Sequence, residues 1–579
     1  MTPIKKVLSL LNRNERRNAV VLIVLMIIGV MLETLSIGLI IPALAIVLQN
    51  ESGPRDHRLQ ALLDFLGNPS QAQLLTGAMF SLVAIYTIKN VYTAFLTWRQ
   101  TRFTFELQTD LAKRLFTTYL QQPYSFHLGH NSAELIRNVS GEVNLFGLVV
   151  INAITLATET MVLAAIGILL LKIELLGTLI VMLVLGAASL AFNYATRSRI
   201  HRWGQARHHH ATLVAQHLQQ GLNGAKEIKL LGREKNFVDR YDFHNRESVR
   251  IGGLQTMMLQ FPRLWLEILA VAGMAALVEI MLYQGRDLAI IVSTLGLFAA
   301  AAFRLMPSAM RIISAIQTIK FNLPAVDTVY SELQRSAPID VTTTTACHFE
   351  RELRVHEVSY SYPDSASPAV ENLSIDVRKG ECIGIIGPSG SGKSTIIDLV
   401  LGLLTPQTGM ISVDGQDIQS CLRNWQNQIG YVPQSIYLTD DTLRQNVAFG
   451  LPDDQIDDSA VSRALDAAQL SSFIATLPGG VETIVGERGV RLSGGQRQRI
   501  GVARALYHSP SVLVLDEATS ALDNETESGV MDAISGLRGK TTIIIVAHRL
   551  TTVASCDRLY RLEHGTLAEA GTPAELGIG

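Results

Sequence analysis

A glycine-rich segment in the second half of the chain has the residue types and spacing of a phosphate-binding loop. The sequence from Gly387 to Ser394 reads GPSGSGKS, follows a buried apolar stretch that starts at Cys382 and precedes helical sequence up to Leu404. This strand, loop and helix order is the context in which the pattern GxxxxGKS binds nucleotide phosphates. Glycine lets backbone N–H groups approach the phosphates at a helix N-terminus. The segment therefore predicts a nucleoside triphosphate site.

Two side chains of this segment have separate expected roles. Lys393 is expected to reach the β- and γ-phosphates, and the hydroxyl of Ser394 to bind Mg²⁺. The other residues expected around the phosphates are Gly387, Ser389, Gly390, Ser391, Gly392 and Thr395.

Acid and base side chains follow two further apolar strands. One strand, from Ser511, ends in Asp516-Glu517, and another, from Thr542, ends just before His548. Ligands of open α/β sheets bind at the carboxyl ends of the strands. We expect Asp516 to hold Mg²⁺ through water and Glu517 to polarise the water that attacks the γ-phosphate, with His548 at the same edge. An ordinary hydrogen-bonded histidine is the alternative for His548.

The first half of the chain has a different composition. Over all 579 residues, 48% are hydrophobic and only 17% are charged, against about 25% charged in soluble domains. Such a composition argues against a disordered chain, an ordinary soluble enzyme and a nucleic-acid-binding protein. The apolar runs lie before about residue 320, and the four cysteines have no CxxC spacing that would suggest a zinc site.

Six stretches have the roughly 20 apolar residues that a membrane span needs. They are residues 19–48, 72–98, 144–171, 173–194, 251–284 and 287–316. Lys and Arg gather at the N-terminus and in the two long connections, whereas the opposite side has only Arg55, Arg58, Lys172 and Arg286. By the positive-inside rule, the N-terminus, the long connections and everything after residue 316 are expected to be cytoplasmic.

The fold class that follows is an all-α membrane domain of six helices with long cytoplasmic extensions, followed by an α/β P-loop ATPase domain. We place the membrane domain at residues 1–335, a linker at 336–350 and the ATPase domain at 351–579. Helical periodicity continues through the long connections, which are expected to bend in short transverse segments near 124–131 and 224–237. Residues 56–66 have an apolar helical face that either lies on the outer membrane surface or packs on the protein.

Several charged residues lie within the predicted spans, where charge is costly and often functional. Counting about 1.5 Å per residue places Glu33, Lys89, Arg263 and Arg304 at one depth, with Arg311 below them. In one interpretation, Lys89, Arg263, Arg304 and Arg311 line a cavity and bind a phosphate or pyrophosphate headgroup. In the other, Arg263 pairs with Glu267, Glu33 neutralises Lys89 or Arg304, and Arg311 faces the cytosol. The roles of Glu159 and Glu279 stay open.

The second half resembles the nucleotide-binding cassette of ABC transporters, and the whole chain resembles their exporter type. The segment from Leu492 to Gln496 reads LSGGQ, which matches the ABC signature, and it lies between the phosphate-binding loop and Asp516. Further matches in order are the adenine-stacking Tyr362, the Q-loop Gln434, the X-loop at 486–489, the D-loop ending in Asp523 and the switch histidine His548.

The resemblance implies cofactors, partners and further site residues. It implies ATP with Mg²⁺, bound in composite sites between two cassettes, with Gln434 both in the catalytic set and as a Mg²⁺ ligand. Ser493, Gly494, Gly495 and Gln496 of one chain, with Asp523, would face the ATP held by the other. One cassette and six spans are half of such a transporter, so a homodimer in the bilayer is expected; a heterodimer is the alternative. No nucleic-acid partner is expected.

A closer resemblance concerns the substrate. Residues 32–42, the segment 56–66 and the run from Phe303 to Arg311 resemble PglK-type flippases of lipid-linked oligosaccharides. In that family, cavity arginines handle the pyrophosphate; Arg304 and Arg311 match by motif, Arg263 and Lys89 by depth. This implies export of a polyprenyl-pyrophosphate glycan across a bacterial inner membrane. The alternatives are an exporter of peptides or hydrophobic drugs and a lipid A type flippase. A soluble ATPase is excluded by the six spans, and an ATP-gated channel is disfavoured by Glu517 and His548.

Overall fold

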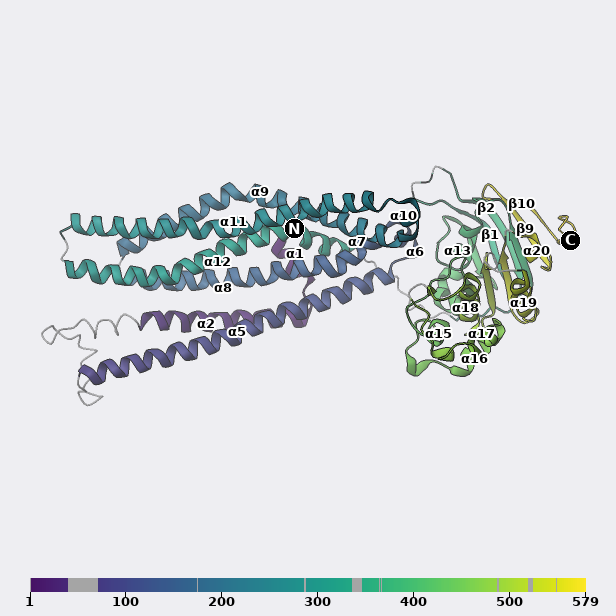
Figure 1. Ribbon diagram of the computed structural model, residues 1–579, viewed down its shortest axis with the longest axis horizontal. Helices are drawn as coiled ribbons and strands as arrows, with labels where there is room; N and C mark the ends of the chain where they lie inside the picture. Colours follow the sequence, from purple (N-terminus) through teal and green to yellow (C-terminus); the bar gives the residue numbers. More distant parts are fainter. Residues whose placement is uncertain are drawn as a thin grey trace. The chain divides into compact units, whose positions relative to one another are not determined.

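The chain folds into two compact units, which are described here one at a time from a computed structural model (Figure 1). The first unit comprises residues 1–122 and 130–337, and the second comprises 123–129 and 338–579. The structure describes residues 2–39, 71–173, 175–285, 288–335, 346–363, 365, 367–486, 489–518, 524–547 and 549–578.

Six long helices make up most of the first unit. They are α2 (Arg13–Gly38), α5 (Gln71–Gln121), α8 (Val143–Ile173), α9 (Leu175–Asn223), α11 (Glu234–Tyr283) and α12 (Leu288–Gln334). Each overlaps one of the six predicted apolar stretches, and α5, α9, α11 and α12 continue well beyond them. Residues 40–48 of the first predicted span and the predicted helix at 56–66 lie outside the described residues.

The apolar character of these helices fits a membrane region. Among the described residues, four segments are long and apolar enough to cross a bilayer: Arg13–Ser36, Met79–Leu120, Ser132–Lys172 and Glu234–Tyr283. Large apolar side chains cover outward surfaces; Phe80 on α5, for example, is 73% exposed. Contiguous exposed apolar surface of this kind is stable in lipid and unfavourable in water.

Short elements precede or connect the long helices. They are α1 (Pro3–Leu10), α6 (Tyr124–Gly129), α7 (Ser132–Arg137), the π-helix η1 (Asn138–Glu142) and α10 (Ala225–Leu231). The short helices α6 and α10 lie within the two ranges, 124–131 and 224–237, where the sequence predicts transverse segments. In the first unit, α12 packs chiefly on α8, α11 on α9 and α2 on α5 (Figure 1). A small buried cluster of Val30, Val162, Ile166 and Leu170 joins α2 to α8.

Two sheets form the core of the second unit. The antiparallel sheet has the order β2-β1-β4-β5, and the larger sheet has the order β10-β9-β3-β8-β7-β6, in which only β10 is antiparallel. The strands are β1 (Glu352–Tyr360), β2 (Val370–Arg378), β3 (Cys382–Ile386), β4 (Thr408–Val413), β5 (Gln416–Asp417), β6 (Ile429–Val432), β7 (Val512–Asp516), β8 (Thr542–Val546), β9 (Arg558–Glu563) and β10 (Thr566–Gly571).

Helices cover this mostly parallel sheet. They are α13 (Lys393–Val400), α14 (Leu422–Gln426), α15 (Leu443–Val447), α16 (Asp458–Ala467), α17 (Ser471–Ala475), α18 (Gly494–Leu506), α19 (Asn524–Ser535) and α20 (Leu550–Val553), with the 3₁₀ turns η2 (Ile418–Cys421), η3 (Asp453–Gln455) and η4 (Gly480–Glu482). All five residues of β3, β7 and β8 are buried, as expected of strands covered on both faces. Within the predicted linker, Cys347 and Phe349 are buried in the core of this unit.

A single carboxylate fixes the start of the antiparallel sheet. Asp414 accepts the backbone N–H groups of Glu350, Arg351 and Glu352 at 2.7, 3.0 and 2.8 Å. Burial raises the pKa of this carboxyl, but the three hydrogen bonds outweigh that effect and hold the pKa below its ordinary value. The charged form of Asp414 therefore stabilises the fold.

We expect Asp414→Asn to destabilise the ATPase domain at pH 7 by about 1–3 kcal/mol, because an amide cannot accept all three N–H groups. Since the pKa is lower in the folded state, this contribution is present above the unfolded value of 3.8 and is lost as the pH falls below it. Calorimetry of the full chain should show a lower melting temperature at pH 7 and a shrinking difference as the pH falls below that value. The exposed Asp454→Asn is the matched control; equal melting of Asp414→Asn and wild type at pH 7 would disprove the role.

Candidate nucleotide site and membrane charges

The phosphate-binding loop joins β3 to α13 as predicted. Gly387, Gly390 and Gly392 all have positive φ angles, of 152°, 80° and 96°. A Cβ atom at Gly387 would lie 2.3 Å from the carbonyl oxygen of Leu562, and one at Gly392 would lie 2.5 Å from that of Ala369. Only glycine fits these two positions, because both the backbone conformation and the neighbouring carbonyls exclude a side chain.

Lys393 begins α13 with its ammonium group folded back over the loop. Nζ donates to the carbonyl oxygens of Gly387 at 3.0 Å and Pro388 at 2.9 Å. Burial lowers the pKa of Lys393, whereas the carboxylates of Glu517 and Asp516 act to raise it. The hydroxyl of Ser391 is buried and has no hydrogen-bond partner among the described residues. A phosphate group in the loop would satisfy this hydroxyl, so the residues present fit a nucleotide.

Two acids lie at the carboxyl end of β7, as the sequence predicts. Asp516 is 7% exposed, and Glu517 accepts a hydrogen bond from Nε2 of Gln434 at 2.6 Å on Oε2. Glu517 has a φ of 50°, a left-handed conformation that is uncommon for a residue with a side chain and typical of functional sites. The structure thus brings the predicted base, the predicted Q-loop residue and the phosphate-loop lysine together.

The signature segment forms the N-terminus of α18. Ser493 caps this helix: its Oγ accepts the N–H of Gln496 at 3.2 Å, and Oε1 of Gln496 accepts the N–H of Ser493 at 2.9 Å. This reciprocal capping box fixes the first turn and leaves the N–H groups of Gly494 and Gly495 at a positive helix end. Such an end is suited to contact a phosphate.

The predicted adenine-stacking residue lies beside the phosphate-loop helix. The hydroxyl of Tyr362 is 3.2 Å from Oγ1 of Thr395, and its ring packs edge-on to Tyr360 with centroids 5.2 Å apart. Tyr124 of α6 belongs to the same unit; burial raises the pKa of its phenol, and the nearby Asp398 and Tyr362 raise it further. The transverse segment α6 therefore lies close to the predicted nucleotide-binding residues.

Other predicted residues differ in what the structure describes. Ser389, Gly390 and Ser394 are exposed on the loop and the first turn of α13, whereas His548, Asp523 and residues 487–488 of the X-loop lie outside the described residues.

Two functional neighbours escaped the sequence analysis. Gln498, 3% exposed on α18, donates from Nε2 to the backbone oxygen of Glu517 at 3.4 Å. Asp398 lies on α13, where burial and then the charge of Asp516 raise its pKa to about 6. The sequence signal for Asp398 was a carboxylate within the apolar run that follows Lys393. For Gln498 the only sequence signal was its position two residues after the LSGGQ signature.

Comparison with known proteins agrees with this geometry. Residues 370–520 match the family described as ABC transporter, and residues 19–278 match ABC transporter transmembrane region. The chain is 32% identical over 473 residues to an ATP-dependent lipid A-core flippase of Cupriavidus pinatubonensis, covering 80% of this chain and 79% of that protein. It is 31% identical over 509 residues to the protein of the same name from Ralstonia nicotianae, covering 86% and 84%.

This chain belongs to the ABC transporter family. A solved structure of a bacterial Atm1-family ABC exporter with ATP bound superposes with a TM-score of 0.80 over 97% of this chain and 96% of that one; at 24% identity this likeness shows the fold. The fold class predicted from the sequence is confirmed, and so is an ATP hydrolase coupled to transport. The transporter is a multi-pass membrane protein.

Within the membrane helices of this ABC transporter, two predicted ion pairs form. Nζ of Lys89 on α5 lies 3.1 Å from Oε2 of Glu33 on α2, and the two side chains are only 15% and 8% exposed. Nε of Arg263 lies 3.0 Å from Oε1 of Glu267 one turn along α11, and this pair is 61% and 46% exposed.

A third pair was not predicted. Arg311 of α12 forms an ion pair with Glu159 of α8, 152 residues apart in the chain. The side chain of Glu159 is 12% exposed, whereas that of Arg311 is 44% exposed. One interpretation of the sequence had Arg311 facing the cytosol without a carboxylate partner. The structure instead pairs Arg311 with Glu159. The side chain of Arg304 lies outside what the structure describes.

Proposed function

We propose that this ABC transporter is an ATP-driven flippase that moves a phosphate-bearing glycolipid from the inner to the outer leaflet. The observation that carries the proposal is the conjunction of an ATPase site containing Glu517 and Gln434 with membrane helices that hold partly exposed arginines. The relatives named lipid A-core flippases support lipid A-core as the glycolipid, because lipid A is an anionic, multi-chain amphiphile of the chemistry that such arginines recognise.

A lipid-linked oligosaccharide is the second candidate. It rests on the resemblance of residues 32–42 and of the run from Phe303 to Arg311 to PglK-type flippases. Both substrates present phosphate on an apolar anchor, and guanidinium groups bind phosphate in a bidentate manner. Arg304 and Arg311 would therefore serve either substrate.

The exposure of each ion pair indicates which of the four predicted substrate contacts a phosphate could reach. Arg263 and Glu267 are 61% and 46% exposed, so exchange of this carboxylate for a phosphate costs little. The side chain of Arg311 is 44% exposed and within reach of a ligand, although its partner Glu159 is only 12% exposed. The side chain of Lys89 is only 15% exposed beside Glu33, so a phosphate could reach it only by opening a buried ion pair. We propose Arg263, Arg304 and Arg311 as phosphate contacts and assign Lys89 chiefly a structural role.

In the ATPase site, this chain's residues divide the work. Ser394, Gln434 and Asp516 are the residues that would hold Mg²⁺, which supplies charge neutralisation at the phosphates when bound. Lys393 and the loop N–H groups bind the phosphates, and Tyr362 stacks on the adenine ring. Glu517, held by Gln434, accepts a hydrogen bond from the attacking water and orients it. His548 is proposed at the same edge of the sheet.

The assembly and orientation are part of the proposal. We propose a homodimer in a bacterial inner membrane, with the N-terminus and the ATPase domain in the cytoplasm, as the Lys and Arg distribution favours. The capped N-terminus of α18, with Ser493 and Gly495, and Asp523 would complete the ATP site of the partner chain. ATP then stabilises a closed pair of cassettes, and hydrolysis removes that differential binding.

The deciding experiment is transport in proteoliposomes. Purified protein is reconstituted with fluorescent lipid A-core in one set of vesicles and a polyprenyl-pyrophosphate oligosaccharide in another. ATP-dependent loss of the label from the leaflet on the ATPase side, in wild type only and not in Glu517→Gln, supports the flippase. Active ATP hydrolysis with movement of neither lipid would contradict it and favour peptides or drugs.

We expect the double variant Arg304→Ala/Arg311→Ala to reduce lipid transport by about tenfold or more, since each lost charged hydrogen bond costs about 1.5–3 kcal/mol. Basal ATP hydrolysis per correctly folded protein should change little, because neither residue lies in the ATPase domain. Since Arg311→Ala also removes the cation beside the 12% exposed Glu159, transport is compared at equal amounts of monodisperse protein. Arg102→Ala, which removes an exposed arginine paired with Glu106 on α5, is the matched control. Undiminished transport in the double variant would remove both arginines from substrate binding.

A further inference from the structure

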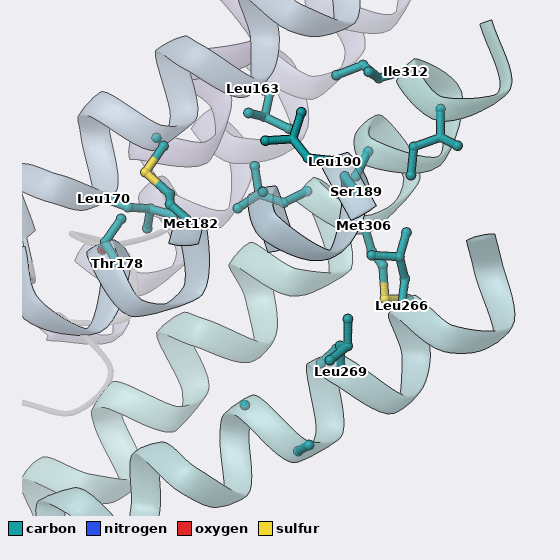
Figure 2. Close-up of a pocket in the computed structure, with 18 of the residues that line it drawn as sticks. Leu163, Leu170, Thr178, Met182, Ser189, Leu190, Leu266, Leu269, Met306 and Ile312 are labelled. Atoms are coloured by element: carbon teal, nitrogen blue, oxygen red, sulfur yellow. The ribbon is translucent and has the colours of Figure 1, made fainter. Parts of the chain in front are cut away.

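A partly open apolar cavity lies among four helices of the membrane unit. It has a volume of about 660 Å³ and is lined by residues of α8, α9, α11 and α12 (Figure 2). Leu163 of α8, Leu190 of α9, Leu269 of α11 and Ile312 of α12 are representative of its lining. Ligand sites typically have volumes of about 300–1,000 Å³, mostly apolar walls and a few placed polar groups.

One polar side chain in this wall lacks a partner. Gln317 of α12 is 3% exposed, and among the described residues neither Nε2 nor Oε1 of its amide has a hydrogen-bond partner. Buried amides are nearly always hydrogen-bonded, because leaving them unpaired is costly. The amide therefore points to a ligand that carries a hydrogen-bonding group next to an apolar portion.

A cationic side chain reaches the wall of the cavity through Asn193. Asn193 of α9 lines the cavity, and its Oδ1 accepts from Nζ of Lys320 at 2.7 Å. Lys320 follows Gln317 by one turn on α12 and lies beyond the apolar span. Burial lowers the pKa of Lys320 and the positive charge of Arg197 lowers it further, so an anion beside these two cations would stabilise both charges.

We propose that this cavity binds one acyl chain of an anionic phospholipid from the surrounding bilayer. The chain fills the apolar part, the ester group bonds the amide of Gln317, and the phosphate lies beside Lys320 and Arg197. An acyl chain fits because the walls are apolar, and a phosphate fits because both cations lie at the level where a span ends and lipid headgroups begin. Neither Arg263 nor Arg311 is among the described residues that line the cavity.

Two glycines offer a way to fill the cavity without disturbing its walls. Gly273 of α11 and Gly186 of α9 both line it, and a Cβ atom at either position would meet nothing within 4 Å. Gly253, also on α11, has equally open space but does not line the cavity. Gly273→Leu and Gly186→Leu are thus the blocking variants, and Gly253→Leu is the matched control.

The test is native mass spectrometry of the full chain in detergent, titrated with palmitoyl-oleoyl phosphatidylglycerol without ATP. Wild type and Gly253→Leu should each retain one tightly bound lipid per chain, and Gly273→Leu and Gly186→Leu should bind it about tenfold more weakly. Gln317→Met should weaken binding while preserving or raising the melting temperature, because the unpaired amide is gone. Arg197→Gln/Lys320→Gln should abolish the preference over phosphatidylcholine.

Three results would overturn the proposal. They are equal phosphatidylglycerol binding by wild type and both correctly folded blocking variants, displacement of the lipid by glycerol 3-phosphate alone, and displacement by equimolar lipid A. The second would indicate a site for free phosphate, and the third a site for the transported lipid. Because no transport is measured, the outcome is independent of the proposed flippase function.

Discussion

Replacing Glu517 by Gln is expected to lower ATP turnover by about 10²- to 10⁴-fold, the range over which a general base contributes. The side chain keeps its size, and the carbonyl of the new amide can still accept the 2.6 Å hydrogen bond from Gln434. Nucleotide binding should therefore persist, since Lys393 and the loop are unchanged. Steady-state phosphate release and binding of a fluorescent ATP analogue measure the two properties separately.

The control for this prediction is Glu371→Gln, which neutralises an exposed carboxylate on β2 in the same unit. It should turn over ATP at the wild-type rate. Turnover by Glu517→Gln within a few-fold of wild type would show that another group activates the water. Loss of ATP binding in Glu517→Gln would instead show that the carboxylate shapes the loop.

The second large effect is expected at the buried ion pair of the membrane helices. Lys89→Gln should remove the ammonium group that lies 3.1 Å from Glu33, a carboxylate that is only 6% exposed. Breaking a buried ion pair from one side costs up to about 3–5 kcal/mol. We expect low yields of monodisperse protein and a melting temperature several degrees below wild type in detergent. Replacing both residues, as Glu33→Gln/Lys89→Gln, should restore most of the stability because no charge then stays buried.

Arg263→Gln is the matched control, because its pair with Glu267 is exposed and exposed pairs contribute at most about 1 kcal/mol. Transport by the double variant separates the two interpretations of Lys89. Recovered transport fits a structural pair, whereas a stable double variant that hydrolyses ATP without moving lipid would place Lys89 among the substrate contacts.

Much of the ATPase site was predictable because its motifs are local. The phosphate-binding loop, the signature and the acids after β7 each occupy consecutive positions, and the covalent chain sets their spacing. The six apolar stretches were predictable for the same reason, because a span is one continuous segment. The ion pair of Arg263 with Glu267 could also be predicted, since residues four apart on a helix are neighbours.

Contacts between distant segments required the tertiary structure. The pairs Gln434 with Glu517 and Arg311 with Glu159 join residues 83 and 152 positions apart, and their partners depend on which helices and strands pack together. Only packing could show that Lys89 is enclosed and that Arg263 and Arg311 stay exposed.

The sequence by itself determined the family, the coupling of ATP hydrolysis to transport and the helical character of the membrane region, since these rest on local motifs and local hydrophobicity. The tertiary structure alone decided that Glu33 pairs with Lys89, that Arg311 pairs with Glu159, and that Gln317 borders a cavity of about 660 Å³. The physical reason is that burial, ion pairing and cavity shape depend on contacts between side chains of different helices. The spacing of residues within one segment does not specify these contacts.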